Sequence, residues 1–459
     1  MRLLVVGADA AGASAAYQAQ RTAQRAGRPL EIVLLERSRH TSYSACGLPY
    51  WVAGDVGDPD DLVARDPGRL RASGFEVHTA TTARSLDLER GVVTATVEGS
   101  SAEMELGFDR LVLATESEPI VPGWARDGAG GLVPGVLPIK TLADGAAWVD
   151  VLRAERAPRR AVVVGGGYIG VEMAEAMLRR GLEVTLVTRG EVMSGLDRDM
   201  GARVRDRLTA AGVEVFPDAA VSGLVTGPGG AVRAVAAADQ EWEADAVVLG
   251  MGVVPATSVG VSGGLPVGAS GGYLPDGHQR VADGVWAAGD CCEIVHRVTG
   301  LPTYLPMGTH ANKQGRVAGT EIAGGSARFD GAIGTAVTRF VAGDVHVEIS
   351  RTGLSTPEAR AAGIAVRAMV TDGRTASGYM PGAAPMATKV LADRGSRRLV
   401  GMQIVGGPGA GKRIDTAAAA IWAGCSVDDL AGMDLAYAPP FATVWEAVQL
   451  AGRRLADRL

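Results

Sequence analysis

Cysteine, lysine and long apolar runs are all scarce in this chain of 459 residues. The four cysteines do not follow a secreted disulfide pattern, so we expect a reducing compartment, the cytoplasm. No apolar run approaches the length of about 18 residues that suggests a membrane span, and strand-like sequence begins at Arg2. We therefore expect neither a membrane partner nor a signal peptide.

Basic clusters are also missing. Lysine occurs at only four positions, and 45 Lys and Arg are set against 51 Asp and Glu, for a net charge of -6. A nucleic-acid partner is therefore not expected. The six histidines form no cluster with metal-ligand spacing, so no metal site is predicted.

The chain is too long for one hydrophobic core, and two to three domains are expected. An internal duplication supports this division. A buried strand at 3–6 runs into a Gly-rich turn and an Ala-rich helix, and the pattern recurs from 161. A second strand follows in each unit, at 31–36 and 184–187. Two such βαβ units predict two dinucleotide-binding domains.

The second Gly-rich turn has the complete glycine pattern in Gly165, Gly167 and Gly170. Such a turn lets the backbone and the helix N-terminus approach a pyrophosphate. The strand after it ends in Thr188-Arg189, where an NAD site would carry an acid. An arginine can instead meet a 2′-phosphate, which favours NADPH over NADH. The alternative is that Arg189 is a solvated loop residue.

The first turn departs from the pattern. Gly7 and Gly12 are present, but Asp9 replaces the middle glycine. A carboxylate beside a pyrophosphate is unfavourable unless it points away or is protonated. Glu36, at the end of the next strand, is placed to bind ribose hydroxyls. A nucleotide site is favoured, with a purely structural turn as the alternative.

One cysteine follows this first unit. Cys46 lies in the stretch 42–50, and no second cysteine stands between Thr41 and Trp51. An internal Cys-x4-Cys disulfide is therefore impossible. A lone thiol beside a dinucleotide site suggests sulfur redox chemistry with an external partner, which could be a small thiol, oxygen or a persulfide. The alternative is a small buried residue.

Together these motifs resemble those of the flavin-dependent pyridine nucleotide–disulfide oxidoreductases. Within them the chain is similar to the single-cysteine branch of coenzyme A-disulfide reductases, NADH oxidases and NADH peroxidases. The matching stretches are 42–50, 108–115, 165–172, 286–291, 311–319, 351–354, 412–415 and 437–441.

The resemblance implies an α/β fold with two Rossmann-like domains and a C-terminal α+β dimerisation domain. The FAD domain would comprise 1–115 and 250–325, the NAD(P)H domain 116–249 and the dimerisation domain 326–459. In the last of these, strands are expected at 337–349, 365–370, 387–392 and 399–405. The implied cofactors are FAD and NADPH, with NADH as the alternative, and the implied assembly is a homodimer.

Roles for single residues also follow from the resemblance. Cys46 would lie against the flavin, Glu172 beside the nicotinamide, and Tyr437 in the active site of the partner subunit. Glu36 would bind the FAD adenosine ribose and Asp290 the ribityl chain. The other cofactor-binding candidates are Gly7, Gly12, Arg37, Thr115, Gly165, Gly167, Tyr168, Ile169, Gly170, Thr188, Arg189 and Gly252. The substrate-binding candidates are Arg21, Arg25, Ser42, Asn312 and Tyr379.

Position 10 helps to choose within the branch. The oxidases and peroxidases have a histidine there, whereas this chain has Ala10, as in the CoA-disulfide reductases. Without that proton donor, reduction of oxygen or peroxide is disfavoured. Arg21 and Arg25, one helical turn apart, suit the phosphates of CoA, although a solvated helix face explains them equally well.

The sequence therefore predicts reduction of CoA disulfide, or a related small disulfide or persulfide, through Cys46. Glu116 stands where the family usually has glycine and adds a second acid to Asp9 near the FAD pyrophosphate. We expect FAD to bind, with these acids turned outward or offset by Arg37. The alternatives are an NAD(P)H oxidase, or a relative that has lost FAD and serves as a nucleotide-binding or sensor protein. The sequence leaves open whether Cys291 and Cys292 are redox active.

Overall fold

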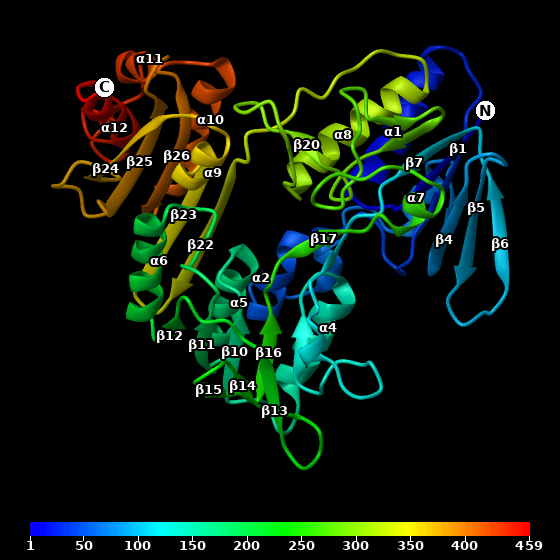
Figure 1. The fold of residues 1–459 in the computed structure, drawn as a ribbon, viewed down its shortest axis with the longest axis horizontal. Helices are drawn as coiled ribbons and strands as arrows, with labels where there is room; N and C mark the ends of the chain where they lie inside the picture. Colours follow the sequence, from blue (N-terminus) through cyan, green and yellow to red (C-terminus); the bar gives the residue numbers. More distant parts are fainter.

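The computed structural model describes all residues, 1–459, as three sheet-centred domains (Figure 1). The first sheet is parallel except at one edge, where β18 pairs antiparallel with β19. Its strands, in spatial order, are β18 (Arg280–Ala282), β19 (Val285–Ala287), β7 (Arg110–Leu113), β1 (Arg2–Val6), β2 (Glu31–Leu35) and β3 (Glu76–His78).

Both faces of this first sheet are covered. Helices α1 (Ala10–Arg25) and α8 (Gly308–Ile322) pack on the face that carries Leu3 and Val5. The face with Leu4 and Val6 packs against α7 (Ser258–Ser262) and a small antiparallel sheet. That sheet consists of β4 (Thr81–Asp87), β5 (Val92–Val97) and β6 (Glu103–Gly107). Burial on both faces explains why the central strands are continuously apolar.

The second domain repeats this plan with a fully parallel sheet. Its strands, in spatial order, are β12 (Val213–Phe216), β11 (Glu183–Val187), β10 (Arg160–Val164), β16 (Ala246–Leu249) and β9 (Val136–Pro138). Its helices are α4 (Leu142–Arg153), α5 (Tyr168–Arg179) and α6 (Arg198–Ala210). A small sheet of β13 (Gly223–Thr226), β14 (Val232–Ala236) and β15 (Glu241–Glu243) covers the opposite face.

The third domain contains an antiparallel sheet with helices packed on it (Figure 1). Its strands, in spatial order, are β22 (Ala336–Ala342), β23 (Val345–Gly353), β26 (Leu399–Gly406), β25 (Pro385–Asp393) and β24 (Val366–Arg374). Its helices are α9 (Thr356–Ala361), α10 (Ile414–Ala423), α11 (Val427–Gly432) and α12 (Ala447–Ala456). The expected strand 337–349 is wrong as one element, because a turn at Gly343 and Asp344 divides it into the hairpin β22–β23.

Short elements complete the chain. A ribbon of β8 (Ser117–Pro119) and β17 (Val253–Pro255) lies at the two crossings between the first and second domains. The remaining short helices and strands are α2 (Leu48–Ala53), α3 (Pro67–Ala72), β20 (Ile294–Val295) and β21 (Pro302–Thr303). Four 3-10 helices lie at Ala45–Gly47, Pro59–Leu62, Gly123–Ala125 and Gly411–Arg413. The domain boundaries at residues 115, 249 and 325 remain predictions. None of the helices combines the length and the apolar composition needed to cross a membrane.

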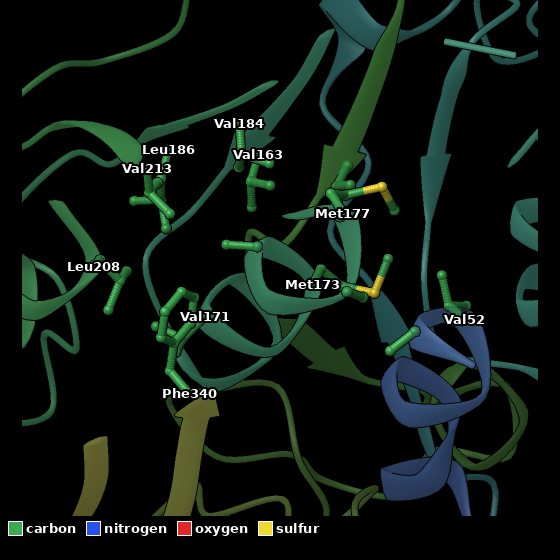
Figure 2. Close-up of a cluster of buried hydrophobic side chains, with 14 of the residues drawn as sticks. Val52, Val163, Val171, Met173, Met177, Val184, Leu186, Leu208, Val213 and Phe340 are labelled. Atoms are coloured by element: carbon green, nitrogen blue, oxygen red, sulfur yellow. The ribbon is translucent and has the colours of Figure 1, made fainter. Parts of the chain in front are cut away.

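Helix α5 is the point where all three domains meet. Figure 2 shows Val171 and Met173 of α5 within one apolar cluster that includes Val52 of α2 and Phe340 of β22. Strands β10 and β11 contribute Val163, Val184 and Leu186 to the same cluster. Because α2 begins two residues after Cys46, this packing attaches the segment that contains the thiol to the second domain.

A buried ion pair also joins the second and third domains. Lys389 of β25 places its Nζ 2.6 Å from Asp197 Oδ2 and 2.7 Å from Asp199 Oδ1, just before and within α6. Thr356 donates its backbone N–H and its hydroxyl to Asp197. These bonds hold the pKa of Asp197 below its usual value despite burial, which acts in the opposite direction.

Close packing of α1 on α8 depends on two glycines four residues apart. A Cβ at Gly315 would lie 2.1 Å from the Ala11 carbonyl oxygen, and one at Gly319 would lie 2.2 Å from that of Ala15. The stretch 311–319 that carries the family resemblance is thus, in part, a helix-packing motif.

Gly315→Ala should destabilise the holoenzyme by roughly 1–3 kcal/mol, because the added methyl group forces the two helices apart. The matched control is Gly308→Ala in the same helix, where a Cβ would meet nothing within 4 Å. Thermal unfolding measures both variants. Equal stability of the two would contradict this explanation of the motif.

Candidate active site

The first Gly-rich turn accepts only glycine at its two key positions. Gly7 has φ of +100°, and a Cβ there would lie 2.0 Å from the Ala114 carbonyl oxygen. A Cβ at Gly12 would lie 1.8 Å from the Gly7 carbonyl oxygen. This tight turn directs the N-terminus of α1 toward the carboxyl end of the sheet, where a pyrophosphate can bind.

Glu36 stands beside this turn as the sequence predicts. Its Oε2 accepts the Ala8 N–H at 2.9 Å, and its Oε1 accepts the Ser38 N–H at 2.8 Å. The side chain is buried, and burial raises its pKa, although these two bonds oppose the rise. The carboxylate is thereby oriented at the end of β2, where a ribose would lie.

Asp9 does not point outward. It caps α1 without accepting a backbone bond, and its carboxyl group lies next to that of Glu116. Burial, Glu116 and Glu36 together raise the pKa of Asp9 to about 8, with Lys140 acting in the opposite direction. At neutral pH Asp9 therefore keeps its proton, so this site carries one negative charge fewer than the sequence suggests.

Glu116 has φ of +63°, the conformation that explains why glycine is usual there. Its Oε2 is 3.9 Å from Arg37 Nη2, so Arg37 partly offsets its charge, as expected. With the proton on Asp9 and the cation of Arg37, the residues of the first turn fit an anionic cofactor such as FAD.

Asp290 marks the other side of the first site. Burial raises its pKa, while Lys140, with Nζ 3.7 Å from Asp290 Oδ2, lowers it. Ser117 donates its hydroxyl to the same oxygen at 3.3 Å. The Thr115 hydroxyl is bonded to the Ala256 carbonyl and so joins the two crossings between domains. Sequence reasoning did not select Lys140, although the rarity of lysine in this chain could have drawn attention to it.

The segment before Cys46 is held against the first turn. Ser42 adopts φ of +47° and donates its N–H to the Ala8 carbonyl at 3.1 Å. Its own carbonyl accepts the Ala64 N–H at 2.8 Å. A left-handed serine at this point is the kind of local strain that clusters at functional sites. The segment then continues to Cys46, whose thiol is free and exposed.

Charges from both nucleotide sites act on Cys46. Partial loss of its water shell raises its pKa, and the carboxylates of Glu172 and Asp290 raise it further. Lys140 is the cation that lowers it. The polypeptide alone therefore favours the thiol over the thiolate, and stabilisation of the thiolate must come from groups that bind at the site.

The second turn also requires glycine at two positions. Gly165 has φ of +111°, and a Cβ there would lie 2.2 Å from the Gly250 carbonyl oxygen. A Cβ at Gly170 would lie 1.8 Å from the Gly165 carbonyl oxygen. At Gly167, by contrast, a Cβ would meet nothing within 4 Å, which leaves this side of the turn open to a cofactor.

The other cofactor-binding candidates for the second site lie on α5, after β11 and at the domain crossing. Tyr168 and Ile169 form the first turn of α5, and burial raises the pKa of Tyr168 to about 12. Thr188 is buried at the end of β11, whereas Arg189 is exposed and makes no ion pair. Gly252, with φ of +92°, accepts the Ile120 N–H at 3.0 Å at the domain crossing.

Glu172 lies on α5 and accepts the hydroxyl of Thr338 from β22 at 2.7 Å between Oγ1 and Oε1. Burial and Glu175 raise the pKa of Glu172 to about 7, and Thr338 opposes that rise. Sequence reasoning missed Thr338, because its partner is 166 residues away and no motif links the two.

The remaining candidates do not gather around Cys46 within one chain. Tyr379 and Tyr437 are exposed in loops of the third domain, and Ser377 bonds to Pro439 and Ala442 to bring those loops together. Neither tyrosine makes a hydrogen bond to the segment 42–50, although β22 of the same domain contacts α2 through Phe340 and Arg339. Asn312 is exposed on α8 and accepts the Ser14 hydroxyl at 2.8 Å.

Arg21 and Arg25 are exposed on α1, and Arg21 donates to Gln18. Cys291 and Cys292 are separate buried thiols, with their sulfur atoms 3.8 Å apart.

Comparisons with known proteins agree with this geometry. A model for the pyridine nucleotide-disulphide oxidoreductases matches residues 1–315, and one for the dimerisation domain of that family matches 344–448. The chain is 32% identical to an NAD(P)H coenzyme A polysulfide/persulfide reductase of Pyrococcus horikoshii, over 99% of this chain and 98% of that protein. It is 31% identical to an NADH oxidase of Methanocaldococcus jannaschii, over 100% of this chain and 99% of that protein.

A solved structure shows the same fold. The NAD-dependent persulfide reductase of A. fulgidus superposes with a TM-score of 0.91 at 33% identity, covering 100% of this chain and 83% of that chain. The predicted family, fold class and cofactors are thereby confirmed. The chain belongs to the pyridine nucleotide-disulphide oxidoreductase family, with FAD and NAD(P)H as its cofactors and a dimerisation domain toward its C-terminus.

Proposed function

We propose that this protein is an NADPH-preferring reductase of CoA disulfide, or of a related small disulfide or persulfide. The observation that carries the proposal is the lone exposed thiol of Cys46, which is influenced both by Asp290 of the first nucleotide site and by Glu172 of the second. Bound FAD supplies the transfer of an electron pair from NADPH to sulfur.

The chemistry at Cys46 is thiol–disulfide exchange. Two electrons and one proton convert the mixed disulfide between Cys46 and a small thiol into the Cys46 thiolate and the free thiol. The thiolate then attacks the next disulfide, which reforms the mixed disulfide and releases a second thiol as its thiolate. Each cycle oxidises one NADPH and reduces one disulfide, so no second protein cysteine is needed.

Three further features support the substrate, the nucleotide and the assembly. Arg21 lies about 16 Å along α1 from Ala10. This separation suits a ligand whose phosphates lie far from its thiol, as those of CoA do. Arg189 is exposed and unpaired, so it is available to a 2′-phosphate. A second copy of the chain fits the exposed apolar side chains of the dimerisation domain. These are Val337, Tyr379, Trp422, Tyr437, Phe441, Val444 and Trp445.

An NAD(P)H oxidase is the second candidate. Ala10 counts against it, because no histidine stands at that position to supply protons. One observation favours it: Asp9, the neighbour of Ala10, keeps a proton at neutral pH. Rapid NADPH-dependent oxygen uptake without any thiol substrate would support the oxidase instead of the reductase.

Cys46→Ser should reduce NADPH-dependent reduction of CoA disulfide to background, because the attacking sulfur is lost. Flavin reduction by NADPH should persist, and anaerobic titration should consume one electron pair fewer than in the wild type. Cys425→Ser, at a half-buried cysteine of the third domain, is the control and should behave like the wild type. Retained CoA-disulfide reduction in the Cys46 variant would exclude the proposed mechanism.

Arg189→Ala should raise KM for NADPH by roughly 10-fold or more and leave KM for NADH unchanged, because a charge-assisted bond to the 2′-phosphate is lost. Steady-state kinetics with both nucleotides measure the change. Arg207→Ala is the control, since Arg207 is exposed on α6 without an ion pair. An equal effect on both nucleotides would show that Arg189 does not select between them.

FAD should be held less tightly as the pH rises through about 8, the pKa of Asp9. Below that pH Asp9 is neutral; above it a carboxylate faces the pyrophosphate, which should weaken binding by roughly 10-fold. Asp9→Asn should remove this dependence. Glu116→Gly should strengthen binding, since it relieves a left-handed residue and removes an acid. The rate of FAD release from the holoenzyme, followed by fluorescence against pH, tests both variants.

A further inference from the structure

One hydroxyl connects the dimerisation domain to α5 beside the second nucleotide site. Thr338, on β22 of the dimerisation domain, donates to Glu172 on α5 at 2.7 Å and is only 6% exposed. Burial and the nearby carboxylate of Glu172 raise the pKa of Tyr50, from α2 of the first domain.

The Thr338 hydroxyl points toward the carboxylate. The hydrogen bond that it donates stabilises Glu172 in its charged state, whereas a neutral carboxyl group would gain less from it.

The other surroundings of Glu172 favour its neutral state. Burial and the carboxylate of Glu175 both raise the pKa of Glu172. The other titratable groups that face it are Cys46 and Tyr50 from the thiol segment and Tyr168 from α5. None of these is a cation.

No cation pairs with Glu172. The nearby arginines are engaged elsewhere. Arg179 pairs with Asp55 and Glu175, and Arg339 pairs with Asp55. Thr338 is thus the one group that favours the charged state of Glu172.

The same strand is attached to α5 without Thr338. The Val341 N–H donates to Glu175 Oε2 at 2.7 Å, and Phe340 lies in the apolar cluster with Val171 (Figure 2). The Thr338 hydroxyl is therefore not needed to hold the domains together, and a substitution that removes it should leave the fold intact.

We propose that Thr338 is a positioning residue that keeps Glu172 ionised and oriented at the nicotinamide site, so that the dimerisation domain controls the NADPH half-reaction. The inference rests on the proposed function, in which NADPH reduces the flavin. It gives β22 a role distinct from subunit contact, because its threonine acts through Glu172 of the same chain.

The test compares Thr338→Val, Thr338→Ser and a matched control, Thr388→Val. Thr388 is buried on β25 of the same sheet, and its hydroxyl has no partner. Stopped-flow reduction of the flavin by NADPH is recorded from about pH 6 to pH 9. Loss of the Thr338 hydroxyl should move the midpoint of the pH profile upward by about one pH unit, whereas Thr338→Ser and Thr388→Val should retain the wild-type midpoint.

A second readout does not depend on activity. The carboxyl band of Glu172 in the infrared spectrum of the holoenzyme, identified by its absence in Glu172→Gln, reports the ionisation of this residue directly. The inference would be overturned if Thr338→Val left two quantities unchanged: the pH at which the carboxyl band titrates and the midpoint of the flavin-reduction profile. If the wild-type flavin ignored NADPH at every pH, the proposed function would fail, while the infrared titration would still decide the role of Thr338.

Discussion

The packing of three domains around helix α5 is the constraint on which the site depends. The glycine turn that precedes α5 is the predicted site of one nucleotide, and the apolar face of α5 packs against α2, the helix that follows Cys46. Its polar side chains hold β22 of the dimerisation domain. A single rigid helix therefore sets the position of the thiol relative to both the second turn and the third domain. Small shifts of α5 would disturb all of these relations together.

The electrostatics of the site follow from this convergence. Carboxylates of Asp9, Glu36, Glu116 and Asp290 surround the first site, and Glu172 approaches Cys46 from the second. Such a site repels anions unless its charge is reduced. The structure does this with the proton on Asp9, with Arg37 beside Glu116, and with Lys140 beside Asp290.

Much of the fold could be predicted from the sequence, because local patterns specify it. The apolar strands, the glycines and the residues at strand ends occur in the order that a βαβ unit requires. The structure places Gly7, Gly12, Gly165 and Gly170 in tight turns and Glu36 at a strand end, while their roles in cofactor binding remain predictions. The hairpin β22–β23 was mistaken for one strand, because a short turn at Gly343 interrupts an otherwise continuous β pattern. Arg21 and Arg25 remain open on the helix surface, since exposure alone does not separate a ligand site from a solvated face.

The sequence by itself determined the two nucleotide-binding turns, the lone thiol and the division into Rossmann-like and α+β parts, since each depends on neighbouring residues. Only the tertiary structure decided how the site is charged. Lys140 meets Asp290, Asp9 meets Glu116, and Thr338 meets Glu172 across 166 residues. The physical reason is that ionisation depends on burial and on distant partners, and both exist only once the domains have packed together.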